Sequence, residues 1–219
     1  MQFFMRFLLF LCGLLWLSIA CGGVFYLARY ENTPGEKNVS YPSIFPPESR
    51  IERDAERATL VFFAHPKCPC TRASLRELAR LMTDADGKLK AYVVFIKPKD
   101  ESEEWTQTDL RAYAEAIPNA RVVIDEDERE TRIFNAQTSS LTLLYDRYGN
   151  LRFSGGITAA RGHEGDNAGR RAVFEIVTKE AGEMIETLVF GCPLHKKDCQ
   201  GELMETPDDE TSERANKSK

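Results

Sequence analysis

The chain has 219 residues and a net charge of −5. This length suits one domain with appendages, and a hydrophobic content of 42% is enough for an ordinary core. An acidic balance argues against nucleic-acid binding, which needs a basic face to neutralise phosphates. The composition therefore predicts one globular domain and no nucleic-acid partner.

An apolar N-terminal stretch is the first strong feature. Residues 7–28, FLLFLCGLLWLSIACGGVFYLA, contain no charge. About 20 apolar residues span a bilayer as a helix, whereas the apolar part of a cleaved signal peptide has about 7–15. We therefore expect residues 1–28 to be a single-pass anchor in the bacterial inner membrane, with the domain facing the periplasm.

Two other interpretations of this stretch remain open. Ser18–Gly22 resembles a lipobox, so that Cys21 would carry a lipid after cleavage, and ordinary signal cleavage would release the domain. All three interpretations place the rest of the chain outside the cytoplasm, where cysteine pairs can be oxidised.

The remaining segments alternate between strand and helix patterns. Residues 29–54 are polar and proline-containing and predict a linker, residues 55–200 predict the domain, and the acidic residues 201–219 predict a disordered tail. Short apolar runs predict strands, and apolar residues at helical spacing predict helices. The expected strands are 59–64, 89–96, 121–124, 141–145 and 151–153; the expected helices are 71–83, 108–117, 129–135 and 172–188, with a glycine-rich loop at 155–169.

This order of elements predicts an α/β fold. Strands separated by helices run parallel with right-handed crossovers, and a late hairpin adds antiparallel strands. We expect a three-layer sandwich around a central mixed sheet, which is the layout of the thioredoxin fold.

Two cysteines stand where the first strand meets the first domain helix. Cys68-Pro69-Cys70 follows a buried strand and opens a helix. A helix N-terminus offers unpaired N–H groups and a partial positive charge, which stabilise a thiolate. The thiolate is the form that attacks disulfides and binds soft metals. Cys68 and Cys70 are therefore the predicted catalytic residues.

The residues around this pair resemble a known family. FFAHPKCPCTRASLREL is similar to the active-site strand, loop and helix of thioredoxin-like proteins, in particular of membrane-anchored TlpA/ResA-type oxidoreductases. LTLLYDRYGNLRFSGGIT resembles their hairpin, and CPCTRASL, GHEGDN and VFGCPL together resemble RedB-type proteins. The resemblance implies a thiol–disulfide oxidoreductase without a cofactor, in which Cys68 attacks a protein or a small thiol or disulfide.

Two departures from the family pattern leave other functions open. One residue is missing between the cysteines, so that a Cys68–Cys70 disulfide would close a small, strained ring. Ser140 stands where the family has a cis-proline. One alternative is a Cu(I)-binding protein similar to Sco-type metallochaperones, with Cys68, Cys70 and His163 as ligands. Another is a non-catalytic thioredoxin-like binding module.

Strand parity predicts that the glycine-rich loop lies near the cysteines. His163 would tune a thiolate, move a proton or bind a metal, and Glu164 and Asp166 would orient it. The alternative is an exposed loop in which Asp166 or Asn167 caps the last helix.

Four further residues have two interpretations each. His65 either supports the site or makes a local hydrogen bond, and Arg72 either lowers a thiol pKa or faces solvent. Cys192 and Cys199 are expected to form a structural disulfide near the C-terminus. The other possibility is that Cys192 resolves a disulfide with Cys68 or Cys70.

Overall fold

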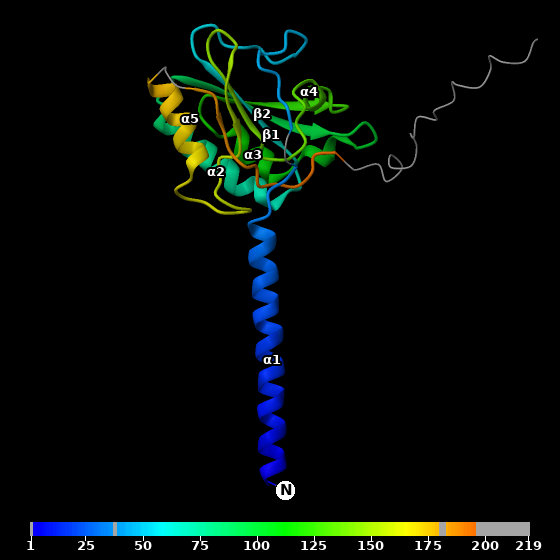
Figure 1. The fold of residues 1–219 in the computed structure, drawn as a ribbon. Helices are drawn as coiled ribbons and strands as arrows, with labels where there is room; N and C mark the ends of the chain where they lie inside the picture. Colours follow the sequence, from blue (N-terminus) through cyan, green and yellow to red (C-terminus); the bar gives the residue numbers. More distant parts are fainter. Residues whose placement is uncertain (1, 37–38, 180–182, 196–219) are drawn as a thin grey trace, which may run out of the picture.

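One long helix stands apart from a compact domain. The computed structural model describes residues 2–36, 39–179 and 183–195 (Figure 1). Helix α1, Gln2–Glu31, has no buried residue and is long and apolar enough to cross a membrane. It extends beyond residues 7–28 at both ends.

A six-stranded mixed sheet forms the centre of the domain, in the order β3-β2-β1-β4-β5-β6. β1, β2 and β3 run parallel, β4 is antiparallel to β1, and β5 is antiparallel to β4. This is the mixed sheet that the sequence predicts, and its topology is thioredoxin-like. The strands are β1 (Ala58–Ala64), β2 (Leu89–Lys97), β3 (Ala120–Glu126), β4 (Thr142–Tyr145), β5 (Leu151–Gly155) and β6 (Ile185–Glu186).

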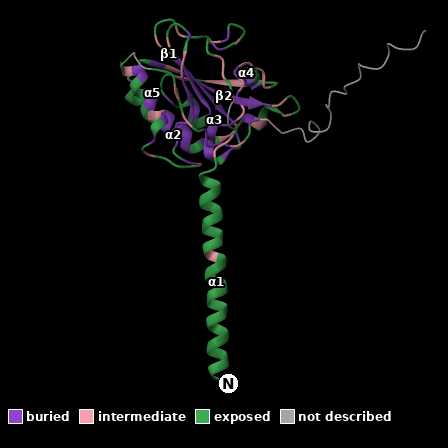
Figure 2. Ribbon diagram, in the orientation of Figure 1, coloured by how far each residue is buried: buried purple, intermediate pink, exposed green. Residues whose placement is uncertain are grey.

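Helices cover both faces of the sheet, which makes the three layers (Figure 2). α2, α3 and α5 pack against one face, whereas α4 and irregular segments cover the other. The helical elements are α2 (Pro69–Asp84), a 3₁₀ turn (Glu103–Thr106), α3 (Asp109–Glu115), α4 (Arg129–Ile133) and α5 (Ala168–Lys179).

Strand β1 is buried on both sides, as its continuous apolar run predicts. Leu60 and Phe62 join the core under α2, α3 and α5, and Val61 and Phe63 join the core on the opposite face. Successive side chains of a strand alternate between faces, so one apolar run serves both layers. This places the end of β1, which leads to the cysteines, in a rigid setting.

The segment predicted as a linker packs on the domain. The Phe45 ring lies 5.5 Å from Phe134 and 5.1 Å from Tyr145, centroid to centroid. Ile44 forms an antiparallel bridge with Asn150, and Ile51 is buried. These contacts hold much of the chain between α1 and β1 against the sheet.

The predicted helix 172–188 is wrong in its second half. Helix α5 ends at Lys179, and Ile185–Glu186 forms β6, parallel to β5. Apolar spacing alone does not separate a helix from a short strand. Gly155 allows this pairing, because a Cβ there would lie 2.2 Å from Thr187 Oγ1. The predicted tail and Cys199 lie outside the described residues.

Candidate functional site

Cys68 is the N-cap residue of α2. Its extended backbone connects β1 to the helix, and Pro69 occupies the first helical turn, where a missing N–H costs nothing. The Cys68 N–H donates to His65 O (3.1 Å), and the Thr71 N–H donates to Cys68 O (3.1 Å). The sulfur therefore sits at the positive end of the helix, as the sequence predicts.

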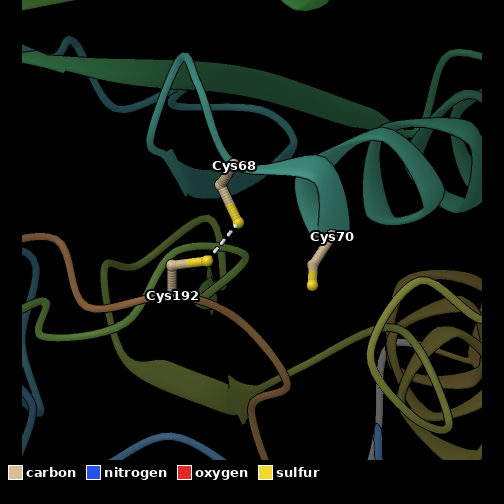
Figure 3. A group of neighbouring side chains, drawn as sticks. All are labelled: Cys68, Cys70 and Cys192. Atoms are coloured by element: carbon tan, nitrogen blue, oxygen red, sulfur yellow. Dashed lines mark hydrogen bonds between the residues drawn. The ribbon is translucent and has the colours of Figure 1, made fainter. Parts of the chain in front are cut away.

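Three cysteines meet at this helix end. The Cys68 and Cys192 Sγ atoms lie 2.9 Å apart, and these two side chains point toward each other (Figure 3). Cys70 extends from the first turn of α2, and all three sulfurs lie within 4.8 Å of one another. We call Cys68, Cys70 and Cys192 the sulfur cluster. Cys68 is only 2% exposed.

The cluster is electrostatically asymmetric. The hydrogen bond with Cys192 is the main cause that lowers the pKa of Cys68 to about 4, helped by Thr71 and opposed by burial. Burial, followed by the charge on Cys68, raises the pKa of Cys70. The hydrogen bond with Cys68, then burial, raises the pKa of Cys192. Cys68 is therefore the thiolate at neutral pH, beside two protonated thiols.

The segment that carries Cys192 lies alongside the loop before β4. The Ser139 N–H donates to Cys192 O (2.8 Å), and the Leu194 N–H donates to Gln137 O (2.9 Å). Between these bonds, Thr138 and Pro193 form an antiparallel bridge. We call residues 189–194 the strap. Its backbone pairing fixes Cys192 opposite Cys68.

Gly191 allows the strap to come this close. A Cβ at Gly191 would lie 1.8 Å from Ser139 O, so only glycine fits. On either side, Val189, Phe190 and Leu194 are buried. The sequence VFGCPL thus serves a packing purpose around the cysteine.

Ser139, rather than Ser140, makes the polar contacts beside the cysteines. The Ser139 hydroxyl accepts a hydrogen bond from the His65 N–H (2.9 Å) and lies 2.8 Å from Thr71 Oγ1. Ser140 has a φ of +74°, and its N–H donates to Phe63 O. Its buried hydroxyl has no hydrogen-bond partner among the residues that the structure describes. The backbone hydrogen bond to Phe63, at the end of β1, therefore holds Ser140 beside the site.

Arg161 is a site residue that no sequence pattern indicated. Its Nη1 donates to Gly191 O (2.6 Å) and its Nε donates to Thr33 O (3.1 Å). Its charge and hydrogen bond also oppose the rise in the pKa of Cys70. Arg161 lies within the glycine-rich loop 155–169, and its contacts bring this part of the loop to the sulfur cluster.

The predicted residues further along this loop lie elsewhere. His163 is exposed and is not part of the sulfur cluster. Glu164 pairs with Arg76 (2.6 Å) on α2, and Asp166 is fully exposed. The set Cys68, Cys70 and His163 is therefore not assembled. The third sulfur beside Cys68 and Cys70 comes from Cys192.

A buried carboxylate holds the loop in place. Glu77 of α2 is fully buried and accepts hydrogen bonds from the Gly165 N–H (2.8 Å) and from Arg80 (2.6 Å). Arg170 Nε lies 2.8 Å from the same carboxylate. Asn167 caps α5 by accepting a hydrogen bond from the Arg170 N–H, as one of the sequence interpretations expects.

His65 and Arg72 make local contacts. His65 Nδ1 accepts a hydrogen bond from the Lys67 N–H (3.1 Å), and its ring packs edge-on against Trp105. Burial lowers the pKa of His65, so it is neutral at pH 7. Arg72 pairs with Asp109 on the surface. His65 adjoins the site through its backbone bond to Ser139, whereas Arg72 points to another helix.

Comparison with known proteins supports the fold. No family model matches the chain, and a search of curated proteins found no match. A hypothetical protein from Sinorhizobium meliloti is 19% identical, with a TM-score of 0.56 over 74% of this chain and 97% of that chain. An uncharacterized conserved protein from Geobacillus kaustophilus is 15% identical, with a TM-score of 0.55 over 76% and 94%.

The pneumococcal exposed lipoprotein thioredoxin Etrx1 from Streptococcus pneumoniae is more distant. It is 15% identical, with a TM-score of 0.42 over 57% of this chain and 86% of that chain. The two stronger likenesses show that the chain shares its fold with these two proteins. The strand order is that of a thioredoxin-like sheet.

Proposed function

We propose that this protein is a thiol–disulfide oxidoreductase in which Cys68 of the Cys-Pro-Cys motif is the attacking thiolate. The observation that carries the proposal is the position of Cys68 at the N-terminus of α2, with a second thiol 2.9 Å away. A nucleophile for disulfide exchange must be deprotonated and must have a thiol nearby to resolve the mixed disulfide. The lowered pKa of Cys68 meets the first condition.

The low pKa also supports a direction for the reaction. A stabilised thiolate stabilises the reduced form of the protein and is a good leaving group when it is part of a disulfide. Both effects favour transfer of a disulfide to a substrate dithiol. The expected substrates are protein or small thiols and disulfides, and the reaction needs no cofactor.

The tethered arrangement is part of this proposal. Helix α1 would anchor the chain in the inner membrane, with the domain in the periplasm, where disulfides persist. Arg161 links Glu31 and Thr33, at the end of α1, to Gly191 beside Cys192. The sulfur cluster would then lie at the membrane-proximal end of the domain and act on substrates near the bilayer.

Turnover assays with the full chain in detergent micelles test the proposal in both directions. We expect insulin reduction with dithiothreitol, or oxidation of a reduced peptide, to depend on Cys68 and to vanish in Cys68→Ser. Cys12→Ser, in the exposed membrane helix, is the matched control and should retain the activity. Equal rates for wild type and Cys68→Ser would refute the proposal.

A second candidate function is Cu(I) binding at the sulfur cluster. It is favoured by the presence of three sulfurs within 4.8 Å, because soft thiolates select Cu(I). The Arg161 guanidinium would offset part of the negative charge of three thiolates. The test is competition for Cu(I) with a colorimetric chelator, and Cys192→Ser should weaken binding whereas His163→Ala should not. Loss of all copper to a weak chelator would refute it.

A further inference from the structure

Cys192 is better placed than Cys70 to react with Cys68. The Cys68 and Cys192 sulfurs are 2.9 Å apart, and their side chains face each other from separate segments (Figure 3). Cys70 lies two residues beyond Cys68, inside the first turn of α2. A disulfide between two cysteines separated by a single residue would close a small, strained ring.

The approach of Cys192 is built into the backbone. Two hydrogen bonds and an antiparallel bridge align the strap with residues 137–139, and Gly191 lets the two backbones touch. Arg161 holds the strap from its other side through Gly191 O. If Cys192 only filled space in the core, its sulfur would not need to lie this close to the sulfur of Cys68.

We propose that Cys192 is the resolving thiol, so that the working disulfide joins Cys68 to Cys192 and not to Cys70. This inference rests on the proposed oxidoreductase function and names a second catalytic residue for it. Cys70 then remains a thiol throughout the cycle.

The two steps balance in atoms and electrons. The Cys68 thiolate attacks a substrate disulfide R–S–S–R′, forms the mixed disulfide Cys68–S–S–R and releases R′–S⁻. Cys192 then loses its proton and attacks Cys68 Sγ, which forms the Cys68–Cys192 disulfide and releases R–S⁻. Two electrons pass from Cys68 and Cys192 to the substrate disulfide. The one proton that Cys192 loses ends on one of the two released sulfurs, and solvent protonates the other if its pKa requires it. The reverse sequence oxidises a substrate dithiol.

Access to Cys68 requires that Cys192 first moves aside. Cys68 is 2% exposed, so a substrate sulfur does not reach it while the strap is closed. The closed strap and an incoming substrate therefore compete for the same sulfur. When the strap returns, Cys192 meets the mixed disulfide at Cys68.

Trapping of the mixed disulfide tests the inference. All proteins are full-length chains in which Cys12, Cys21 and Cys199 are replaced by serine, and each is mixed with an aromatic disulfide whose released thiolate absorbs visible light. With both Cys70 and Cys192 present, we expect a rapid second release and a mapped Cys68–Cys192 disulfide. Cys192→Ser should stop after the first release and keep the adduct on Cys68, whereas Cys70→Ser should complete both releases.

The reverse pattern, with the adduct trapped in Cys70→Ser and resolved in Cys192→Ser, would overturn the inference and leave the proposed function intact. No adduct at Cys68 in any of the proteins would refute both.

A second variant tests the position of Cys192 without removing any thiol. Gly191→Val keeps all three cysteines but cannot maintain the contact with Ser139 O, so it should prolong the life of the adduct by at least tenfold. Leu188→Ala, at an exposed position three residues earlier, should resolve at the wild-type rate. Unchanged resolution in Gly191→Val would also count against Cys192.

Discussion

The Sγ atoms of Cys68 and Cys192 lie 2.9 Å apart although 124 positions separate the two residues in the sequence. Cys68 lies between β1 and α2, and Cys192 lies in the strap after β6. This contact adds a third thiol to the Cys68-Pro69-Cys70 motif.

The first prediction concerns the pH dependence of Cys68 reactivity. Its folded pKa of about 4 lies below the ordinary 9.0, so the thiolate persists from alkaline pH down to about 4 and is lost only below that pH. The rate of iodoacetamide modification of Cys68, followed by peptide mass spectrometry, should therefore stay flat across neutral pH and fall with a midpoint near 4. A midpoint near 9 would contradict this assignment.

The second prediction identifies the cause of that shift. The hydrogen bond with Cys192 is the largest cause that lowers the pKa of Cys68, so Cys192→Ala should move the alkylation midpoint upward. Cys70→Ala is the comparison variant. The hydrogen bond between Cys70 and Cys68 is the last of the causes that raise the pKa of Cys70, so its loss should move the Cys68 midpoint less than Cys192→Ala does. Equal midpoints in the two variants would show that the helix end, and not the strap, stabilises the thiolate.

The third prediction separates two arginines. Arg161 opposes the rise in the pKa of Cys70, so Arg161→Met should raise the alkylation midpoint of Cys70. It should also free the strap from Thr33. Arg72→Met is the control, because Arg72 pairs with Asp109 and should leave the Cys70 midpoint unchanged. A larger effect from Arg72 would support the sequence interpretation in which Arg72 lowers a thiol pKa.

The fourth prediction concerns stability and the buried carboxylate. Glu77→Gln weakens charge-assisted contacts to Arg80, Arg170 and the Gly165 N–H, and should lower the free energy of unfolding by about 2 kcal/mol. Glu164→Gln weakens only part-exposed ion pairs and should lower the free energy of unfolding by less than Glu77→Gln does. Urea unfolding of both variants measures the difference, and equal losses would show that Glu77 does not anchor the loop.

Much of the fold was predictable because its signals are local. The apolar run at 59–64, the helical spacing after Cys70 and the turn residues between β4 and β5 each determine one element, and strand parity then gives the sheet. The end of α5 was not predictable in this way. β6 forms because it pairs with β5 beside Gly155 and Gly156. The residues near β6 in the sequence do not include this pairing strand, so they do not predict it.

The site residues also divide into those indicated by local sequence and those that depend on contacts across the fold. The position of Cys68 before a helix predicts its thiolate character, because capping and the helix dipole are local effects. The roles of Cys192, Ser139 and Arg161 depend on contacts across the fold, so spacing along the chain did not single them out as a set. The metal hypothesis placed His163 at the cysteines because it lies in the same loop as Arg161. In the structure, His163 is exposed to solvent.

Equilibration of the reduced full chain with glutathione redox buffers, followed by disulfide mapping, tests the central claim most directly. A thiol–disulfide oxidoreductase must gain and lose its disulfide reversibly within the range of such proteins, about −120 to −270 mV. The account predicts one reversible transition in that range, in which Cys68 becomes linked to Cys192. Cys68 that stays a free thiol in the most oxidising buffer would contradict it, as would a disulfide that no buffer reduces.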